Sequence, residues 1–385
     1  MIQIKIDSKI KDKIKKIHWK WFSTRMEQKV WPNNQSHKDF IFANINFLDP
    51  KEKNLKKSAK EKIKNLRLRK LIIGEPNSKI GNQSIYDFFQ NINKKYKWHN
   101  TGTMSKKPNE TKKAFNARKK KWEEDNKHIK DLQTAFGYDD FVSSPLNEQW
   151  YINFKKHNGD NDWNIKVLSE KLSVDVCPYC NRQYIFGYEL QDKKRNIAEI
   201  DHFKPKSHYP YLSCSLYNFV PSCHTCNSIK QAQDKDILYP YTDSLDDYTK
   251  KVKNARFLFK AKDGSAIKFP INKGTPKEIE LNINPNYSKS AEANNAKKLF
   301  HIDEIYTKHI LELNDIIERY KKCTPKQFNA LYNFMTNDLK IRISEKNLKK
   351  LILGLPIDAT KEYPLRKFKE DIIDYIEEKA KANIK

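Results

Sequence analysis

The 385-residue sequence has no run of about 18 apolar residues, which excludes a transmembrane helix. Residues 1–16, MIQIKIDSKIKDKIKK, also lack the apolar core of a signal peptide. We therefore expect an intracellular, cytoplasmic protein without a membrane partner. No internal repeat is present.

Cysteine is scarce, and its distribution is uneven. Four of the six cysteines stand in two C-x2-C pairs, and the other two are Cys214 and Cys323. In an intracellular chain this spacing favours metal binding over disulfide bonds. Cys214 and Cys323 are expected to be ordinary reduced thiols within the fold.

Acidic residues are outnumbered by basic ones. The chain has 75 Lys and Arg against 48 Asp and Glu, a formal net charge of +27. Such an excess indicates a polyanionic partner, with nucleic acid as the first candidate. The alternative is a lysine-rich composition without functional meaning. Hydrophobic content of 38% and aromatic content of 12% indicate a folded protein.

Much of the positive charge lies in residues 51–130. This segment has 24 Lys or Arg against 8 Asp or Glu, so it carries +16 of the net +27. Its two most basic runs, 51–70 and 111–122, contain few helix breakers and are compatible with helices. They could lie along a phosphate backbone or could simply be solvated helical faces.

The two cysteine pairs predict a structural zinc site. Cys177 and Cys180 are separated by 42 residues from Cys223 and Cys226. A C-x2-C turn directs both thiolates at one ion, and two such turns complete a tetrahedral site. Because all four ligands come from the protein, no coordination position is left for catalysis.

The segment between the pairs predicts a ββα unit. QYIFGYEL at 183–190 and IAEIDHF at 197–203 read as two strands of a β-hairpin. A long loop with three prolines then precedes a helix that starts near residue 224. Asp201 and His202 end the second strand. On the helix, Asn227 and Lys230 have i, i+3 spacing and share a face.

This pattern resembles the HNH nucleases of the ββα-metal (His-Me finger) superfamily, in the subgroup whose finger is closed by a four-cysteine zinc. DHFKPKS, followed by NFVPSCHTCNSIK, is similar to HNH effectors of bacterial anti-phage systems, such as the Septu nuclease subunit and retron-associated nucleases. The resemblance covers residues 177–230 and rests on Cys177, Cys180, Asp201, His202, Asn218, Cys223, Cys226 and Asn227.

The resemblance implies a role for each motif residue. His202 is the general base that takes a proton from water. Asp201 and Asn227 bind a catalytic Mg²⁺ or Mn²⁺, and Asn218 braces the loop and the strand end. Residue 227 occupies a position that is often His, and an amide oxygen suits a hard cation better than imidazole does. The alternatives are a turn residue at 218 and an exposed helix residue at 227.

The chemistry of phosphodiester hydrolysis agrees with these residue types. A metal ion beside the scissile phosphate neutralises charge, and histidine supplies a base with a pKa near neutrality. Cations near the motif could hold phosphate oxygens. The candidates are Arg182, Lys204, Lys206 and Lys230.

We expect a mainly helical α+β chain with three parts. Residues 1–165 form a basic, mostly helical domain, 166–235 the HNH finger, and 236–385 a small β region followed by helices. In the last part, 255–261, 266–271 and 278–285 are strand-like, with a hairpin between the first two. Helices are predicted at 325–339, 345–354 and 365–382.

The leading hypothesis is a metal-dependent HNH endonuclease that acts on DNA in phage defence or restriction. The alternatives are a non-catalytic zinc-finger protein that binds nucleic acid, and an HNH nuclease that prefers RNA. By analogy with defence nucleases, an ATPase or another sensor protein is an expected partner.

Overall fold

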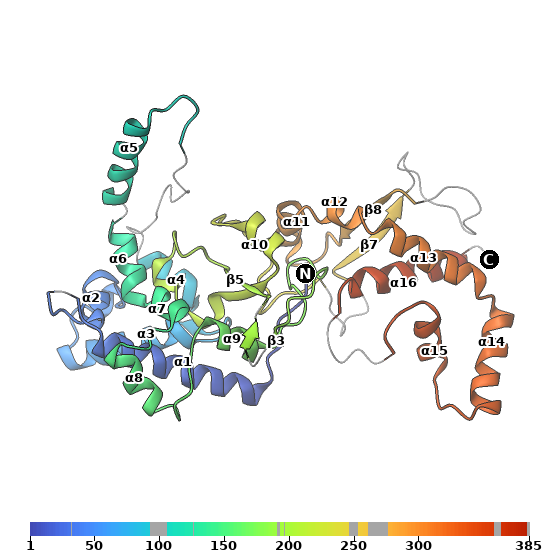
Figure 1. The fold of residues 1–385 in the computed structure, drawn as a ribbon, viewed down its shortest axis with the longest axis horizontal. Coiled ribbons are helices and arrows are strands. Elements are labelled where there is room, and N and C mark those ends of the chain that lie inside the picture. The colour runs from blue at the N-terminus through green and yellow to red at the C-terminus, as the bar shows by residue number, and fades with distance from the viewer. Residues whose placement is uncertain are drawn as a thin grey trace. The chain divides into compact units, whose positions relative to one another are not determined.

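The structure is a computed structural model that describes residues 1–31, 33–92, 106–125, 127–190, 193–195, 197–245, 253–260, 276–357 and 363–382. Within these ranges the chain is mainly helical, with four small two-stranded antiparallel sheets (Figure 1). The predicted mainly helical α+β composition is confirmed. None of the helices in these ranges combines the length and the apolar character needed to cross a membrane.

The chain forms two compact units. Gln3–Val174 and Ile185–Lys235 make up the first, called here the N-terminal unit. Met1–Ile2, Asp175–Tyr184 and Asp236–Lys385 make up the second, the C-terminal unit.

Helices dominate the N-terminal unit. They are α1 (Ser8–Gln28), α2 (His37–Asn44), η1 (Pro50–Glu52), α3 (Lys57–Ile73), α4 (Ile85–Ile92), α5 (Lys112–Asp125), α6 (Lys127–Phe136), α7 (Tyr138–Ser143), α8 (Gln149–Lys156), α9 (Ile165–Leu172), η3 (Pro210–Leu212), η4 (Leu216–Asn218) and α10 (His224–Lys230). The strands are β1 (Lys79–Ile80), β2 (Gln83–Ser84), β3 (Tyr188–Leu190), β4 (Lys193–Arg195), β5 (Glu199–His202) and β6 (Phe219–Ser222).

Helix α1 organises the core of this unit. The Asp7 side chain caps it by accepting hydrogen bonds from the backbone of Lys9 and Ile10. Trp21 is fully buried, and its ring lies 4.9 Å from that of Phe141 on α7. Further along, Arg25 Nη1 donates to the Ala135 carbonyl at 2.7 Å. These contacts fix α1 against α6 and α7.

Most of each basic run is helical, which agrees with a sequence compatible with helices: α3 contains residues 57–70 of the first run and α5 residues 112–122 of the second. Helix α3 buries Leu68, Leu71, Ile72 and Ile73, while most of its basic side chains are exposed or half-buried. In α5, seven of the first ten residues are Lys, Arg or Asn, and the described side chains are exposed or half-buried. Each helix therefore presents cations to solvent.

The strand that carries the Asp-His pair has a different partner from the one predicted. β5 pairs with β6 in an antiparallel sheet in which Asp201 lies opposite Val220 and His202 opposite Phe219. The expected hairpin of 183–190 with 197–203 is wrong, because β3 pairs with β4 instead. All four residues of β6 are buried, so burial of Phe219 and Val220 stabilises this pairing. The long loop therefore lies between the two strands, and α10 follows β6 through Cys223.

The C-terminal unit has one sheet and a series of helices. Its strands β7 (Ala255–Lys260) and β8 (Glu278–Ile283) are antiparallel, with Phe257 opposite Leu281. The predicted strand at 266–271 and its turn lie outside the described residues. The helices are α11 (Ser290–Leu299), α12 (Ile302–Thr307), α13 (Ile310–Lys322), α14 (Pro325–Asn333), η5 (Phe334–Asp338), α15 (Glu345–Ile352) and α16 (Arg366–Ala382).

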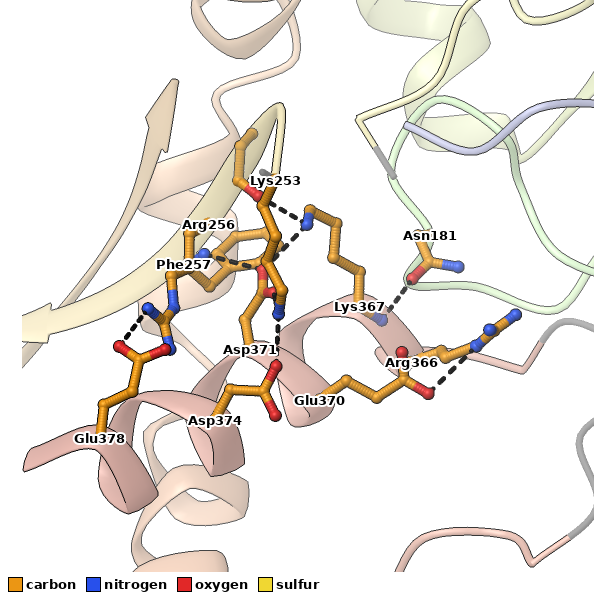
Figure 2. Close-up of polar contacts among 11 residues, drawn as sticks. Asn181, Lys253, Arg256, Phe257, Arg366, Lys367, Glu370, Asp371, Asp374 and Glu378 are labelled. Carbon is orange, nitrogen blue, oxygen red and sulfur yellow. Dashed lines mark hydrogen bonds and ion pairs between the residues drawn. The ribbon is translucent and has the colours of Figure 1, made fainter. Parts of the chain in front are cut away.

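Charged contacts attach α16 to the sheet of this unit (Figure 2). Asp371 is buried and accepts a 2.9 Å hydrogen bond from the Phe257 backbone. It pairs with Lys367 one turn earlier at 3.0 Å, and Lys367 Nζ donates to the Ala255 carbonyl at 2.7 Å. The Lys367 backbone donates to Asn181 Oδ1 at 3.3 Å. The start of α16 thus contacts both the sheet and the segment that follows the first cysteine pair.

Candidate active site and metal centre

The four cysteines of the two C-x2-C pairs come together. Cys177, Cys180, Cys223 and Cys226 are all buried, and their sulfur atoms lie within 4.8 Å of one another. Among the described residues, no other group of three or more His, Cys, Asp or Glu side chains converges in this way. Four clustered thiols can bind a metal ion such as zinc.

Local hydrogen bonds shape each cysteine pair. Cys177 donates its backbone N–H to the Gln183 carbonyl at 3.0 Å and accepts from Asn181 at 2.8 Å. Asn181 adopts the left-handed conformation (φ 51°), which Asn tolerates better than most residues and which turns the chain after Cys180. The second pair begins α10, where the Cys223 sulfur accepts from the Cys226 backbone at 3.4 Å.

One face of β5 meets α10. Glu199 and Asp201 are two residues apart on the strand, so they point to the same side. Asn227 and Lys230 are three residues apart on the helix and also share a side. The two spacings match, so Asn227 contacts Glu199 and Lys230 contacts Asp201.

Asp201 and Lys230 form a buried ion pair. Lys230 Nζ lies 3.0 Å from Asp201 Oδ2 and donates to the His202 carbonyl at 2.8 Å. The two side chains are only 1% and 4% exposed. Burial lowers the pKa of Lys230, and the charge of Asp201 opposes that shift. The ammonium group therefore neutralises a carboxylate that is otherwise removed from water.

Glu199 fixes the orientation of the Asn227 amide. Asn227 Nδ2 donates to Glu199 Oε2 at 2.7 Å, and His224 Nδ1 contacts Oε1 at 2.6 Å. The hydrogen bonds from Asn227 and then His224 lower the pKa of Glu199. Because Glu199 accepts from the NH₂ group, the amide oxygen of Asn227 is the atom left to act as a ligand.

His202 faces a different set of residues. Its Nε2 lies 3.0 Å from the Ser213 carbonyl oxygen, which can only accept, so the ring carries its proton on Nε2 and its lone pair on Nδ1. The ring packs edge-on against Tyr138 and Phe219. Burial, with smaller effects from Lys206 and Lys230, lowers the pKa of His202 to about 3. The imidazole is therefore neutral at pH 7.

Asn218 clamps the loop that joins β5 to β6. Its Oδ1 accepts from the Lys204 backbone at 2.8 Å, and its Nδ2 donates to the Lys204 carbonyl at 2.9 Å and the Leu212 carbonyl at 3.1 Å. The side chain is fully buried. It therefore holds the chain just after His202 and the turn just before Ser213 in fixed positions.

Helices far away in the sequence support the same loop. The Leu71 carbonyl of α3 accepts from Ser215 Oγ at 2.7 Å, and Gln133 Nε2 of α6 donates to the Lys206 carbonyl at 2.8 Å. His18 of α1 contacts the Cys214 carbonyl at 2.8 Å. Sequence reasoning missed these supports and Tyr138, because no local pattern links them to the motif. The i, i+2 spacing of Glu199 and Asp201 did place Glu199 on the same strand face from the sequence, with a solvent-facing residue as the favoured interpretation.

The expected phosphate-binding cations lie in different surroundings. Lys204 pairs with Asp234 at 3.0 Å, and Lys206 Nζ sits 3.5 Å from the centre of the Tyr138 ring. Burial lowers the pKa of Lys206. Arg182 is half-buried in the segment that also holds Cys177 and Cys180. Among the four expected phosphate-binding cations, Lys230 is the one that pairs with Asp201.

Comparisons with known proteins identify one distant relative. The chain is 30% identical over 112 residues to the Septu protein PtuB of Bacillus thuringiensis, which amounts to 28% of this chain and 40% of the relative. The aligned part of the chain therefore spans less than half the length of that relative. No protein-family model and no solved structure matches the chain.

Proposed function

We propose that this chain is a metal-dependent HNH endonuclease that hydrolyses phosphodiester bonds of DNA. The observation that carries the proposal is the setting of His202. It ends the first strand of a ββα arrangement, donates from Nε2 to the Ser213 carbonyl and keeps a lone pair on Nδ1. A base that activates water needs such a neutral, oriented imidazole.

The burial of His202 affects its strength as a base. A pKa of about 3 keeps the ring neutral at pH 7 but makes it a weaker base than a free imidazole. Burial is the largest cause of this low pKa, and the charges of Lys206 and Lys230 contribute to it. A bound phosphodiester brings negative charge near these cations, so substrate binding is expected to raise the basicity of His202.

Asp201 and Asn227 supply the donor set for a hard cation. A carboxylate oxygen and an amide oxygen are the ligands that Mg²⁺ and Mn²⁺ prefer. The fit rests on Asn227, because Glu199 holds its NH₂ group so that its oxygen remains available. The Lys230 ammonium already neutralises the Asp201 carboxylate, so a metal ion would compete with this counter-charge. A bound ion would neutralise charge on the phosphate and the leaving oxygen.

The remaining motif residues have supporting roles. Cys177, Cys180, Cys223 and Cys226 would hold a structural zinc ion with no open coordination position. Asn218 would keep the loop around His202 fixed. Lys204, Lys206 and Arg182 would contact substrate phosphates. Lys230 belonged to that expected set, but its burial against Asp201 assigns it a counter-charge role instead.

The similarity to the Septu protein PtuB supports a role in defence against phage. We propose that the chain acts there as the nuclease, with an ATPase or sensor protein as a partner. The alignment covers only 40% of that relative, so the similarity alone does not assign the relative's role to this chain. The proposed nuclease role and the proposed partner therefore depend on the site residues described above.

A test of the activity compares substrates and metals directly. The purified chain is incubated with supercoiled plasmid or total RNA, with and without added Mg²⁺. Omitting the divalent ion is preferable to a chelator, which would also remove zinc from the cysteines. We expect plasmid relaxation or linearisation that requires Mg²⁺.

Two other outcomes would select the alternatives. Digestion of RNA with intact plasmid would indicate an RNA-specific HNH nuclease. Salt-dependent binding to DNA with no cleavage in any divalent metal would indicate a non-catalytic zinc-finger protein. The exposed cations of α3 and α5 are the observation that favours this second reading.

A further inference from the structure

Helix α14 and the π-helical turn η5 that continues it form an amphipathic segment of the C-terminal unit with no buried residue. Phe328, Leu331, Tyr332 and Met335 follow i, i+3, i+4, i+7 spacing and so line one side. In Figure 1, α14 stands apart from the other helices of its unit. An apolar stripe of this kind normally faces a core, whereas here Leu331 is exposed and Phe328, Tyr332 and Met335 are half-buried.

Exposed apolar side chains continue beyond the end of helix α14. Leu331 is 38% exposed, Phe334 49%, Leu339 51% and Ile341 42%. Single exposed apolar residues are common on protein surfaces, but a contiguous group marks an interaction site. We call Phe328, Leu331, Tyr332 and Met335 the apolar stripe; the exposed Phe334, Leu339 and Ile341 lie beside it or beyond its end.

The helix is formed by local signals rather than by packing. Thr324 and Gln327 make a reciprocal capping box, and Pro325 occupies the first helical turn. The turn at Phe334–Asp338 is a π-helix, a rare conformation that occurs often at functional sites. The stripe is thus presented in a preformed helix, which reduces the entropy lost when a partner binds.

We propose that the apolar stripe docks into an apolar groove of another protein whose rim is acidic. Residues 321–342 contain five basic residues and one acidic residue, Asp338. Among the described residues, Lys322, Lys326, Lys340 and Arg342 form no ion pair. These cations flank both ends of the stripe, so a groove with carboxylates at its two ends is the complementary surface.

Charge excludes a second copy of the chain as the favoured occupant. Stacking two stripes in either direction brings the basic ends of one helix beside the basic ends of the other, which is repulsive. The net charge of +27 on each chain adds to that repulsion.

A membrane surface also fits less well. Helices that lie on membranes carry Lys and Arg across their polar face. The polar face here has uncharged side chains, including Asn329, Asn333 and Asn337, and its cations lie at the ends instead. Nucleic acid fits less well than a protein groove, because Leu331 and Met335 offer neither charge nor an aromatic face, and Phe328 and Tyr332 already stack on each other with ring centres 6.4 Å apart.

The test places a photo-crosslinking amino acid at Leu331 or at Asn333 of the full chain, expressed in its source organism. The two positions lie on opposite sides of the same helix. We expect a defined protein adduct from position 331 and none from 333, and mass spectrometry would identify that protein. Equal crosslinking from both positions, a second copy of this chain, a lipid or nucleic-acid adduct, or no adduct would each overturn the proposal.

Binding of the purified, identified protein is then measured with matched variants. Leu331→Asp and Asn333→Asp add the same charge to opposite faces. We expect Leu331→Asp to raise Kd about 30-fold or more, as for a central anchor residue, and Asn333→Asp to leave it within about 3-fold. The pair Lys326→Glu and Arg342→Glu should also weaken binding and reduce its salt dependence. An unchanged Kd for Leu331→Asp or for the charge-reversal pair would contradict the proposal.

The thermal unfolding midpoint separates docking from a structural role. Because the stripe is exposed, Leu331→Asp should leave the midpoint of the isolated chain unchanged. A clear drop in that midpoint would mean that Leu331 packs within the chain, which would overturn the proposal.

Discussion

Replacement of Lys230 with methionine is expected to lower the free energy of unfolding of the N-terminal unit by about 3–5 kcal/mol when no Mg²⁺ or Mn²⁺ is present. The variant keeps the length and apolar stem of the side chain but removes the ammonium group. Asp201, only 4% exposed, then loses the charge that lies 3.0 Å away. The His202 carbonyl also loses its 2.8 Å hydrogen bond from Lys230 Nζ.

The size of this loss in unfolding free energy follows from the burial of Asp201 rather than from the attraction between Asp201 and Lys230. Removing one partner of a buried pair leaves the other charge without water or a counter-charge, and this desolvation dominates the loss. An exposed pair of the same length contributes only about 0.2–1 kcal/mol.

The chain offers a matched control. Lys204 and Asp234 also lie 3.0 Å apart, but their side chains are 21% and 26% exposed. Lys204→Met should therefore cost about 1 kcal/mol or less. Urea unfolding followed by tryptophan fluorescence measures both variants, because Trp21, Trp150 and Trp163 are buried in the same unit.

The same variant tests the proposed cation site. With Lys230 gone, Mn²⁺ should stabilise Lys230→Met more than the wild type, because the Asp201 carboxylate has lost its competing counter-charge. Equal destabilisation by Lys230→Met and Lys204→Met would refute the burial argument. Equal Mn²⁺ stabilisation of the variant and the wild type would refute the role of Asp201 as a ligand.

Three further predictions concern other parts of the N-terminal unit and the cysteines. Cys226→Ala should abolish retention of the bound metal, measured as zinc per chain by atomic absorption, whereas Cys323→Ala should leave it unchanged. Asn218→Ala should lower the free energy of unfolding by about 2–3 kcal/mol in urea, because it removes three buried hydrogen bonds to the backbone of Lys204 and Leu212; a loss below about 1 kcal/mol would contradict the clamp. Burial lowers the pKa of His18 from 6.5 to about 4, so the unfolded chain binds a proton that the folded chain does not. The free energy of unfolding should therefore fall between pH 6.5 and 4, by at most about 3 kcal/mol from this group, and less steeply in His18→Gln.

The elements that the sequence predicts well are those with strong local signals. The helices expected at 325–339 and 365–382 correspond to α14 with η5 and to α16. Thr324 and Pro325 mark the start of α14 in the sequence itself. The convergence of the cysteines was likewise predictable, because each C-x2-C turn is a local motif with a known use.

Long-range pairing is where prediction from sequence failed. β6 is four residues long and contains Pro221, so it reads as part of a loop, yet it is the partner of β5. Its strand character comes from burial of Phe219 and Val220, which depends on helices distant in sequence.

The surroundings of the candidate base could not be predicted either. Ser213 contributes a backbone carbonyl, which any residue type could supply, and Tyr138 lies more than sixty residues before His202. The pairing of Lys230 with Asp201 depends on the register between α10 and β5. Only the i, i+3 spacing on the helix and the i, i+2 spacing on the strand hinted at it.

The most direct test of the account is the rate of Mg²⁺-dependent plasmid cleavage by His202→Ala. His208→Ala is the matched control, because His208 belongs to the same loop and is assigned no role. Loss of a general base predicts a rate about 10²–10⁴-fold below wild type for His202→Ala, with zinc content and folding retained, and a near wild-type rate for His208→Ala. Cleavage by His202→Ala at the wild-type rate would contradict the assignment of this histidine as the base.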